Sequence, residues 1–151
     1  MRPTLLCLTL IGACSLVGPL SPDERRELTA AEARWKARSF ADYSYEIRVS
    51  CFCSPELSRW TRVSVRGGQV TDAQPVESDP QFPITTLSLW SPIDTLFGVI
   101  RRSAADNTSY LEDVDVTFDR ALGYPTRIEL RAKKNVADGG ALYLLREVRP
   151  L

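Results

Sequence analysis

The sequence predicts an α+β fold, an antiparallel sheet of about five to six strands with an N-terminal and a mid-chain helix packed on one face. Several segments alternate apolar and polar residues with the two-residue period of strands. Two others space their apolar residues three and four apart, as helices do. Because two helices are too few to cover both faces of a parallel sheet, we expect an antiparallel one.

The first helix is expected to begin after Ser21. Ser21 is a suitable N-cap, Pro22 fits the first helical position, and Glu24 completes a capping box. Residues 29–32 form a second such box, and either start gives a helix that ends near Ser39. Its apolar face would consist of Leu28, Ala31 and Trp35.

Strands are expected on both sides of a second helix. Residues 43–53 alternate almost without interruption and form the clearest strand. After a turn at residues 54–56, a strand over 60–66 leads through Gly67-Gly68 into a short strand around Val70. The next stretch should be a loop, because it contains Pro75, Pro80 and Pro83.

The second half begins with another short strand, expected over residues 84–90. The motif that opens at Ser91-Pro92 then signals a helix. Its core-facing stripe consists of Ile93, Leu96, Phe97 and Ile100. Alternating segments at 110–118, 126–133 and 141–148 should finish the sheet as an antiparallel meander.

The start of the chain has the features of a bacterial lipoprotein signal. Arg2 precedes an apolar stretch over residues 5–11, and Gly12-Ala13 provide small residues before Cys14. We therefore expect residues 1–13 to be a cleaved signal peptide, residues 14–21 a tether with lipid on Cys14, and residues 22–151 one domain. A membrane span and an ordinary cleaved signal are the alternatives; Gly18-Pro19 interrupt the stretch before it reaches about 20 apolar residues.

The expected location is the cell envelope, where the lipid on Cys14 would anchor the protein to the membrane. Ser15 favours the outer membrane, facing the periplasm, in a host with two membranes. The chain of 151 residues has 19 basic and 19 acidic side chains, which predicts no attraction to nucleic acid. Its 44% hydrophobic and 25% charged content is typical of a globular domain.

Cys51 and Cys53 are the one pair with possible chemistry. Cys7 leaves with the signal peptide and Cys14 carries lipid, so a disulfide, free or redox-active thiols and a metal site all remain open for this pair. Alternate residues of a flat strand lie about 6.6 Å apart, so a disulfide requires a bulge or a strand end. Metal is disfavoured because the chain has no histidine and no further cysteine pair, and we expect no metal or other cofactor.

Two further groups admit a functional and a structural interpretation. Three acidic residues on one strand face are more typical of a solvated surface than of calcium binding; they are Asp113, Asp115 and Asp119. Three aromatic residues would form either a binding surface or part of the core and sheet edges; they are Trp60, Trp90 and Tyr124.

The absence of histidine excludes Ser-His-Asp and Cys-His nucleophile systems, and we expect no enzymatic activity. The favoured function is a membrane-anchored, non-catalytic interaction or structural domain of the cell envelope with an unidentified protein partner. Thiol-disulfide redox chemistry or soft-metal binding at Cys51 and Cys53 is one alternative. A protein inhibitor or chaperone that acts through a sheet edge is the other.

A set of short motifs, in this order along residues 29–148, adds a resemblance. The set consists of Trp35, Tyr43-x-Tyr45, Cys51-Phe52-Cys53, Gly67-Gly68, Leu96-Phe97 and Gly123-Tyr124-Pro125. It resembles a bacterial lipoprotein family known only as a domain of unknown function. The resemblance implies a small exported or lipid-anchored domain and carries over no catalytic residue.

Overall fold

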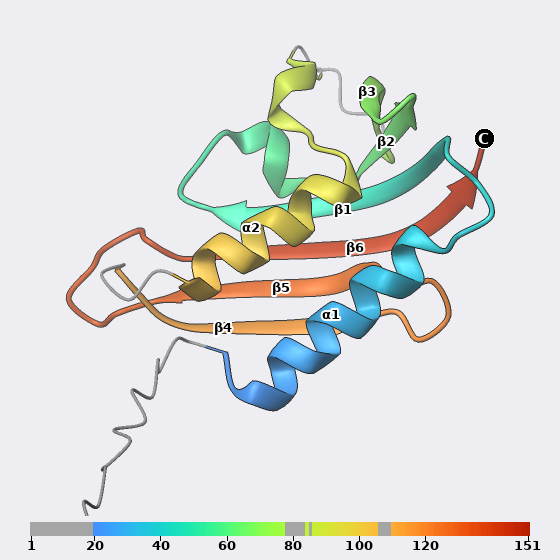
Figure 1. Cartoon of the computed structure of the whole chain (residues 1–151). Helices are drawn as coiled ribbons and strands as arrows, with labels where there is room; N and C mark the ends of the chain where they lie inside the picture. The colour runs from blue at the N-terminus through green and yellow to red at the C-terminus, as the bar shows by residue number, and fades with distance from the viewer. Residues whose placement is uncertain (1–19, 78–83, 85, 106–109) are drawn as a thin grey trace, which may run out of the picture.

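The fold is a six-stranded antiparallel sheet with two helices on one face, which confirms the predicted class (Figure 1). It is seen in a computed structural model that describes residues 20–77, 84, 86–105 and 110–151. The elements are α1 (Pro22–Lys36), β1 (Tyr43–Cys51), η1 (Pro55–Ser58), β2 (Thr61–Arg66), β3 (Gln69–Pro75), η2 (Leu87–Leu89), α2 (Ile93–Ala105), β4 (Leu111–Phe118), β5 (Pro125–Ala132) and β6 (Ala141–Pro150).

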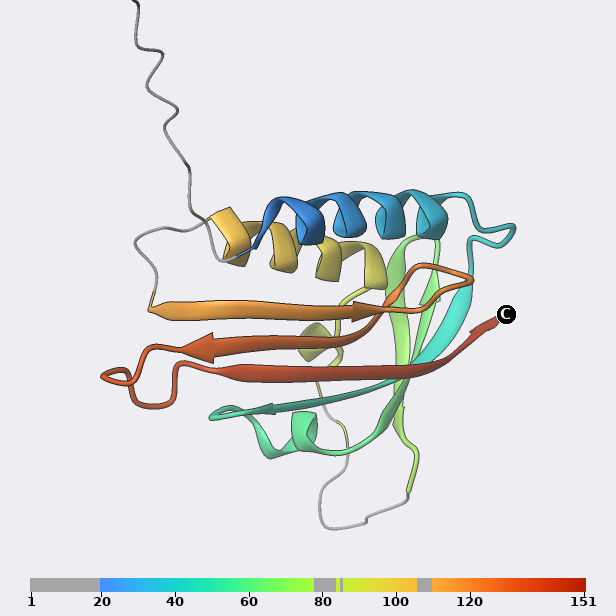
Figure 2. The same cartoon turned by 90° about the horizontal axis from the view of Figure 1, so that it is seen from below.

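The strands are arranged in the order β3-β2-β1-β6-β5-β4, and every neighbouring pair is antiparallel. The last three strands form the predicted meander, and β6 then pairs with β1 in the middle of the sheet. Strands β3 and β4 are the two edges. Figure 2 shows both helices on one side of the sheet, and we call the opposite side the outer face.

Helix α1 begins where its capping box predicts. The Ser21 hydroxyl accepts a hydrogen bond from the Glu24 amide at 3.3 Å, and the Glu24 carboxylate accepts one from the Ser21 amide at 2.6 Å. The second box, residues 29–32, lies inside the helix, where the Thr29 hydroxyl bonds back to the Arg25 carbonyl. The helix ends at Lys36, somewhat before the predicted end.

Two tyrosines of β1 hold the start of α2. The Tyr43 hydroxyl accepts a hydrogen bond from the Ile93 amide at 3.0 Å, and the Tyr45 hydroxyl donates to the Ser91 carbonyl. Burial raises the pKa of both tyrosines above the ordinary value, so they stay neutral. The bond to Tyr43 satisfies one of the amide N–H groups that a helix start leaves unpaired, and the bond from Tyr45 holds the residue before Pro92.

The core lies between the helices and the sheet, around Trp35 of α1. The Trp35 ring meets Tyr43 edge to face, with ring centroids 5.1 Å apart, and lies 6.3 Å from the Tyr124 ring. Gly123, which precedes Tyr124, has φ +81° and lies against α1. A Cβ atom there would overlap the Ala31 carbonyl oxygen and come within 2.8 Å of the Arg34 Cβ.

Three predicted segments differ from the structure. Residues 87–89 form the 3₁₀ turn η2 in place of a strand over 84–90, and the Trp90 amide donates to the Leu87 carbonyl at 3.0 Å. An apolar run this short fits a strand or a turn equally well. Strand β3 is longer than predicted and ends at Pro75, which an edge strand tolerates because its outward N–H groups pair with no neighbour. Strand β1 ends at Cys51, two residues before the predicted end at residue 53.

Neither helix in the described part of the chain has the length and apolar character needed to cross a bilayer.

Candidate functional site

A short disulfide loop follows β1. The structure joins Cys51, the last residue of that strand, to Cys53, with Cα atoms 5.2 Å apart. That separation is shorter than the roughly 6.6 Å between alternate residues of a flat strand, because the backbone bends directly after Cys51. Both cysteines are exposed, and the Phe52 side chain between them is 83% exposed. The loop is therefore accessible to another thiol or to a partner surface.

A second cluster lies on the outer face, centred on Trp60. We call it the Trp60 cluster, and it consists of Glu46, Arg48, Trp60, Arg62 and Arg146. Strand register explains how it forms, since Arg62 of β2 and Arg146 of β6 both lie directly opposite Glu46 of β1. The cluster thus lies across three neighbouring strands, β2, β1 and β6.

Glu46 is the anchor of this cluster. Its side chain is only 5% exposed and accepts hydrogen bonds from Arg62 at 2.6 Å and from the Arg146 Nε at 2.9 Å. Burial alone would raise the pKa of Glu46, but the hydrogen bonds from the two guanidinium groups outweigh it and lower the pKa below its ordinary value. Glu46 is therefore ionised and holds both arginines in place.

Trp60 provides a flat surface for two arginines. The Arg146 guanidinium carbon lies 3.9 Å from the Trp60 ring centroid, and that of Arg48 lies 5.3 Å from it. Both distances are within the range of cation–π attraction. The Arg48 Nε is buried without a hydrogen-bond partner, and in the described part of the chain no carboxylate pairs with Arg48.

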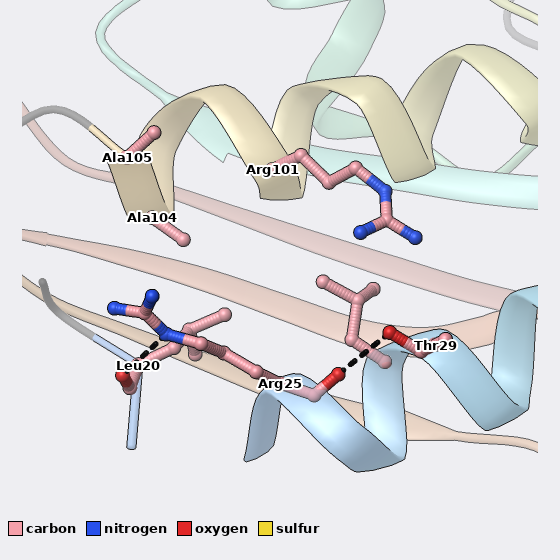
Figure 3. Close-up of a pocket in the computed structure, with 7 residues that line it drawn as sticks. Leu20, Arg25, Thr29, Arg101, Ala104 and Ala105 are labelled. Atoms are coloured by element: carbon pink, nitrogen blue, oxygen red, sulfur yellow. Dashed lines mark hydrogen bonds between the residues drawn. The ribbon is translucent and has the colours of Figure 1, made fainter. Parts of the chain in front are cut away.

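A groove separates α1 and α2 near their ends close to Leu20 (Figure 3). Its cavity volume is about 220 Å³, and Leu20, Leu28 and Ala104 give it an apolar lining. Arg25 and Arg101 extend over it from the two helices. Ligand cavities are usually at least about 300 Å³, and Arg101 is already paired with Glu32 of α1. The groove thus has the features of a gap in helix packing.

The three aromatic residues considered in the sequence do not form one surface. Trp90 and Tyr124 are buried in the core, and only Trp60 lies on the outer face. Trp90 and Tyr124 are therefore core residues and not part of a binding surface. Trp60 contributes to a cluster that the sequence did not reveal, because its partners come from three separate strands.

The acidic residues near β4 are engaged locally. Asp115 pairs with Arg127 at 3.0 Å, and Asp113 pairs with Arg131, both across the β4–β5 ladder. Asp119 was predicted to share their strand face, but it lies beyond the end of β4 and accepts hydrogen bonds from turn amides, including the Leu122 amide. Over residues 20–77, 84, 86–105 and 110–151, no three metal-ligating side chains come together.

The predicted lipidation residue Cys14 lies outside the described residues, as do the signal peptide over residues 1–13 and most of the tether. Lipidation therefore stays a prediction. The Cys51–Cys53 loop and the Trp60 cluster are both placed by β1, the loop at its end and the cluster along its outer side.

Comparison with known proteins identifies a family and no activity. Neither the curated proteins nor the solved structures contain a match to this chain. One family model matches residues 27–150, which covers α1 from Glu27 onward, all of α2 and all six strands. The chain therefore belongs to a family of unknown function, DUF6174.

Proposed function

We propose that this chain is a lipid-anchored protein of the bacterial cell envelope, with a non-catalytic binding domain. Residues 10–14 support the anchor, because small residues precede Cys14 after a short apolar stretch. Several acyl chains on one cysteine give stable attachment, as each buried CH₂ contributes about 0.8 kcal/mol. Ser15 favours the outer membrane, with the domain facing the periplasm in a host that has two membranes.

The outer face is the binding surface in this proposal, and the Trp60 cluster carries the argument. Aromatic and arginine side chains dominate the binding energy of known interfaces. In this cluster Glu46 and Trp60 hold Arg146 in a defined position, so little side-chain entropy is lost when a partner binds. The exposed Phe52 adds an apolar group at the end of the central strand β1.

Substitution of Cys14 tests the anchor. Wild-type chain should fractionate with membranes and incorporate labelled fatty acid, whereas Cys14→Ser should do neither. Cys7→Ser is the matched control, because Cys7 lies within the predicted signal peptide. Membrane attachment that survives Cys14→Ser would refute the lipid anchor.

Site-specific photo-crosslinking tests the binding surface. A crosslinker at Ser50, exposed on the outer side of β1, should trap a defined partner in intact cells. A crosslinker at Ala30, exposed on α1, is the matched control and should not trap it. Adducts from Ala30 alone, or from neither position, would refute binding through the outer face.

Thiol-disulfide exchange is a second candidate, favoured by the exposure of Cys51 and Cys53. A partner thiolate would attack one sulfur of the loop, which forms a mixed disulfide and releases the other cysteine as a thiolate. A second partner thiolate would then attack the partner's own sulfur in the mixed disulfide, which leaves a disulfide on the partner and two thiolates in the loop. Titration of the full chain in glutathione buffers, followed by thiol alkylation and mass measurement, tests this function. A bond that persists at potentials below about −300 mV would make the loop structural and refute the redox role.

A further inference from the structure

The Trp60 cluster has more positive charge than its own carboxylate can neutralise. The cluster has three guanidinium groups and one carboxylate, Glu46, which is bonded to Arg62 and Arg146 while Arg48 lies over the Trp60 ring. One arginine would suffice to compensate a single buried glutamate, so the other two are in excess for a purely structural role. The β4–β5 side of the same face differs, because Arg127 and Arg131 are matched there by Asp113, Asp115 and Glu129.

The remaining donors of the cluster are held in position and accessible. Glu46 engages one nitrogen each of Arg62 and Arg146, whose side chains are 57% and 48% exposed. A guanidinium group has five N–H donors, so most of those on these two arginines are uncommitted to Glu46. Stacking on Trp60 restricts Arg146 further.

Arg48 adds a third and less satisfied group. Its neighbour across the strand pair on β6 is Leu144, which offers no charge. Its Nε is buried without a partner, an arrangement that is unfavourable for a polar donor. An anion beside Trp60 would pair with the Arg48 guanidinium and with the free nitrogens of Arg146.

We propose that Arg48, Arg62 and Arg146 bind a phosphate monoester on a partner other than the membrane. A monoester carries close to two negative charges at neutral pH, which equals the excess positive charge of the cluster. Its three oxygens accept hydrogen bonds from guanidinium groups on different strands. The inference rests on the outer face being the binding surface of the proposed function.

The position of the cluster disfavours the bilayer as the source of the phosphate. Helix α1, which directly follows the predicted tether, lies on the opposite side of the sheet from the outer face (Figure 2). Phospholipid headgroups with a diester linkage also carry one negative charge on their phosphate, which leaves half of the excess positive charge unmatched. A soluble or polymer-borne monoester matches both the placement and the charge.

Binding can be measured from the arginine Nε–H signals in NMR spectra of the full chain in nonionic detergent. The probes are inorganic phosphate and glycerol 3-phosphate, with sodium chloride at matched ionic strength as the reference. We expect the Arg48 and Arg146 signals to shift, with a dissociation constant of about 1 mM or tighter. Arg48→Gln should weaken binding about tenfold, which corresponds to the loss of one charge-assisted hydrogen bond.

Arg131→Gln is the matched control, since Arg131 is as exposed as Arg146 but lies in the balanced β4–β5 part of the face. Unchanged affinity in this variant supports the assignment, and an equal loss would refute it. Shifts that chloride reproduces would also refute it, as would preferential binding to phosphatidylglycerol vesicles. If phosphate fails to bind while the crosslinker at Ser50 still traps a partner, the phosphate site is refuted and the outer face remains the binding surface. If phosphate fails to bind and Ser50 traps no partner, both the phosphate site and the binding surface are refuted.

Discussion

Gly123→Ala tests how closely the loop before β5 packs against α1. Two penalties apply at this residue. The backbone has φ +81°, where an L-residue costs about 1 kcal/mol or more, and the new Cβ would overlap the Ala31 carbonyl oxygen. Because this oxygen belongs to helix backbone, relief requires moving α1 from the sheet, and comparable overpacking costs about 1–3 kcal/mol. We expect a total loss of about 3 kcal/mol in the free energy of unfolding.

Gly68→Ala separates the two penalties. Gly68 has φ +75° in the β2–β3 turn, and a Cβ there would have no atom within 4 Å. It should therefore lose only the conformational part, about 1 kcal/mol. Urea unfolding of the full chain, followed by far-UV circular dichroism, measures both losses. Equal losses in the two variants would show that the loop does not press on α1 and would refute the reasoning.

Three further substitutions test named contacts. Tyr43→Phe should cost about 1–3 kcal/mol in urea unfolding, because the buried Ile93 amide loses its acceptor; a loss below about 0.5 kcal/mol would contradict this. The pKa of Glu46 is lowered on folding, so its contribution is complete above its ordinary value of 4.5 and disappears as the pH falls through the lower folded-state value. Acid unfolding curves of wild type should therefore be steeper than those of Glu46→Gln, and identical slopes would contradict the ion pairs. Ser21→Ala should cost about 1 kcal/mol through loss of the N-cap, whereas Ser39→Ala, beyond the helix, should leave stability unchanged.

Most elements could be predicted because their signals are local. The capping box at Ser21 determines where α1 begins, and the alternation after Tyr43 reports a strand whose two sides differ in burial. The prediction of a strand before Trp90 was wrong because it had only a short local signal to use. The few apolar residues of this segment have no period long enough to distinguish a strand from a 3₁₀ turn.

The Trp60 cluster could not be predicted, because it depends on strand order. Glu46 and Arg146 are 100 residues apart in the sequence, and no local pattern predicts that β6 pairs with β1. If each strand paired only with the strands next to it in the sequence, β6 would lie at a sheet edge, and Arg146 would be far from Glu46. The alternation did place Glu46 and Arg48 together on the polar side of their strand, and this was the only available signal.

The central position of β6 has a consequence for how the protein reaches its native state. Until residues 141–150 are synthesised, β1–β2–β3 and β4–β5 remain separate pieces, and both β1 and β5 have an unpaired edge. The two pieces cannot join until β6 has left the ribosome, and closing contacts across such a sequence distance is slow. For the export route that we propose, this delay would keep the chain unfolded and competent for translocation, while making it dependent on protection from aggregation during transit.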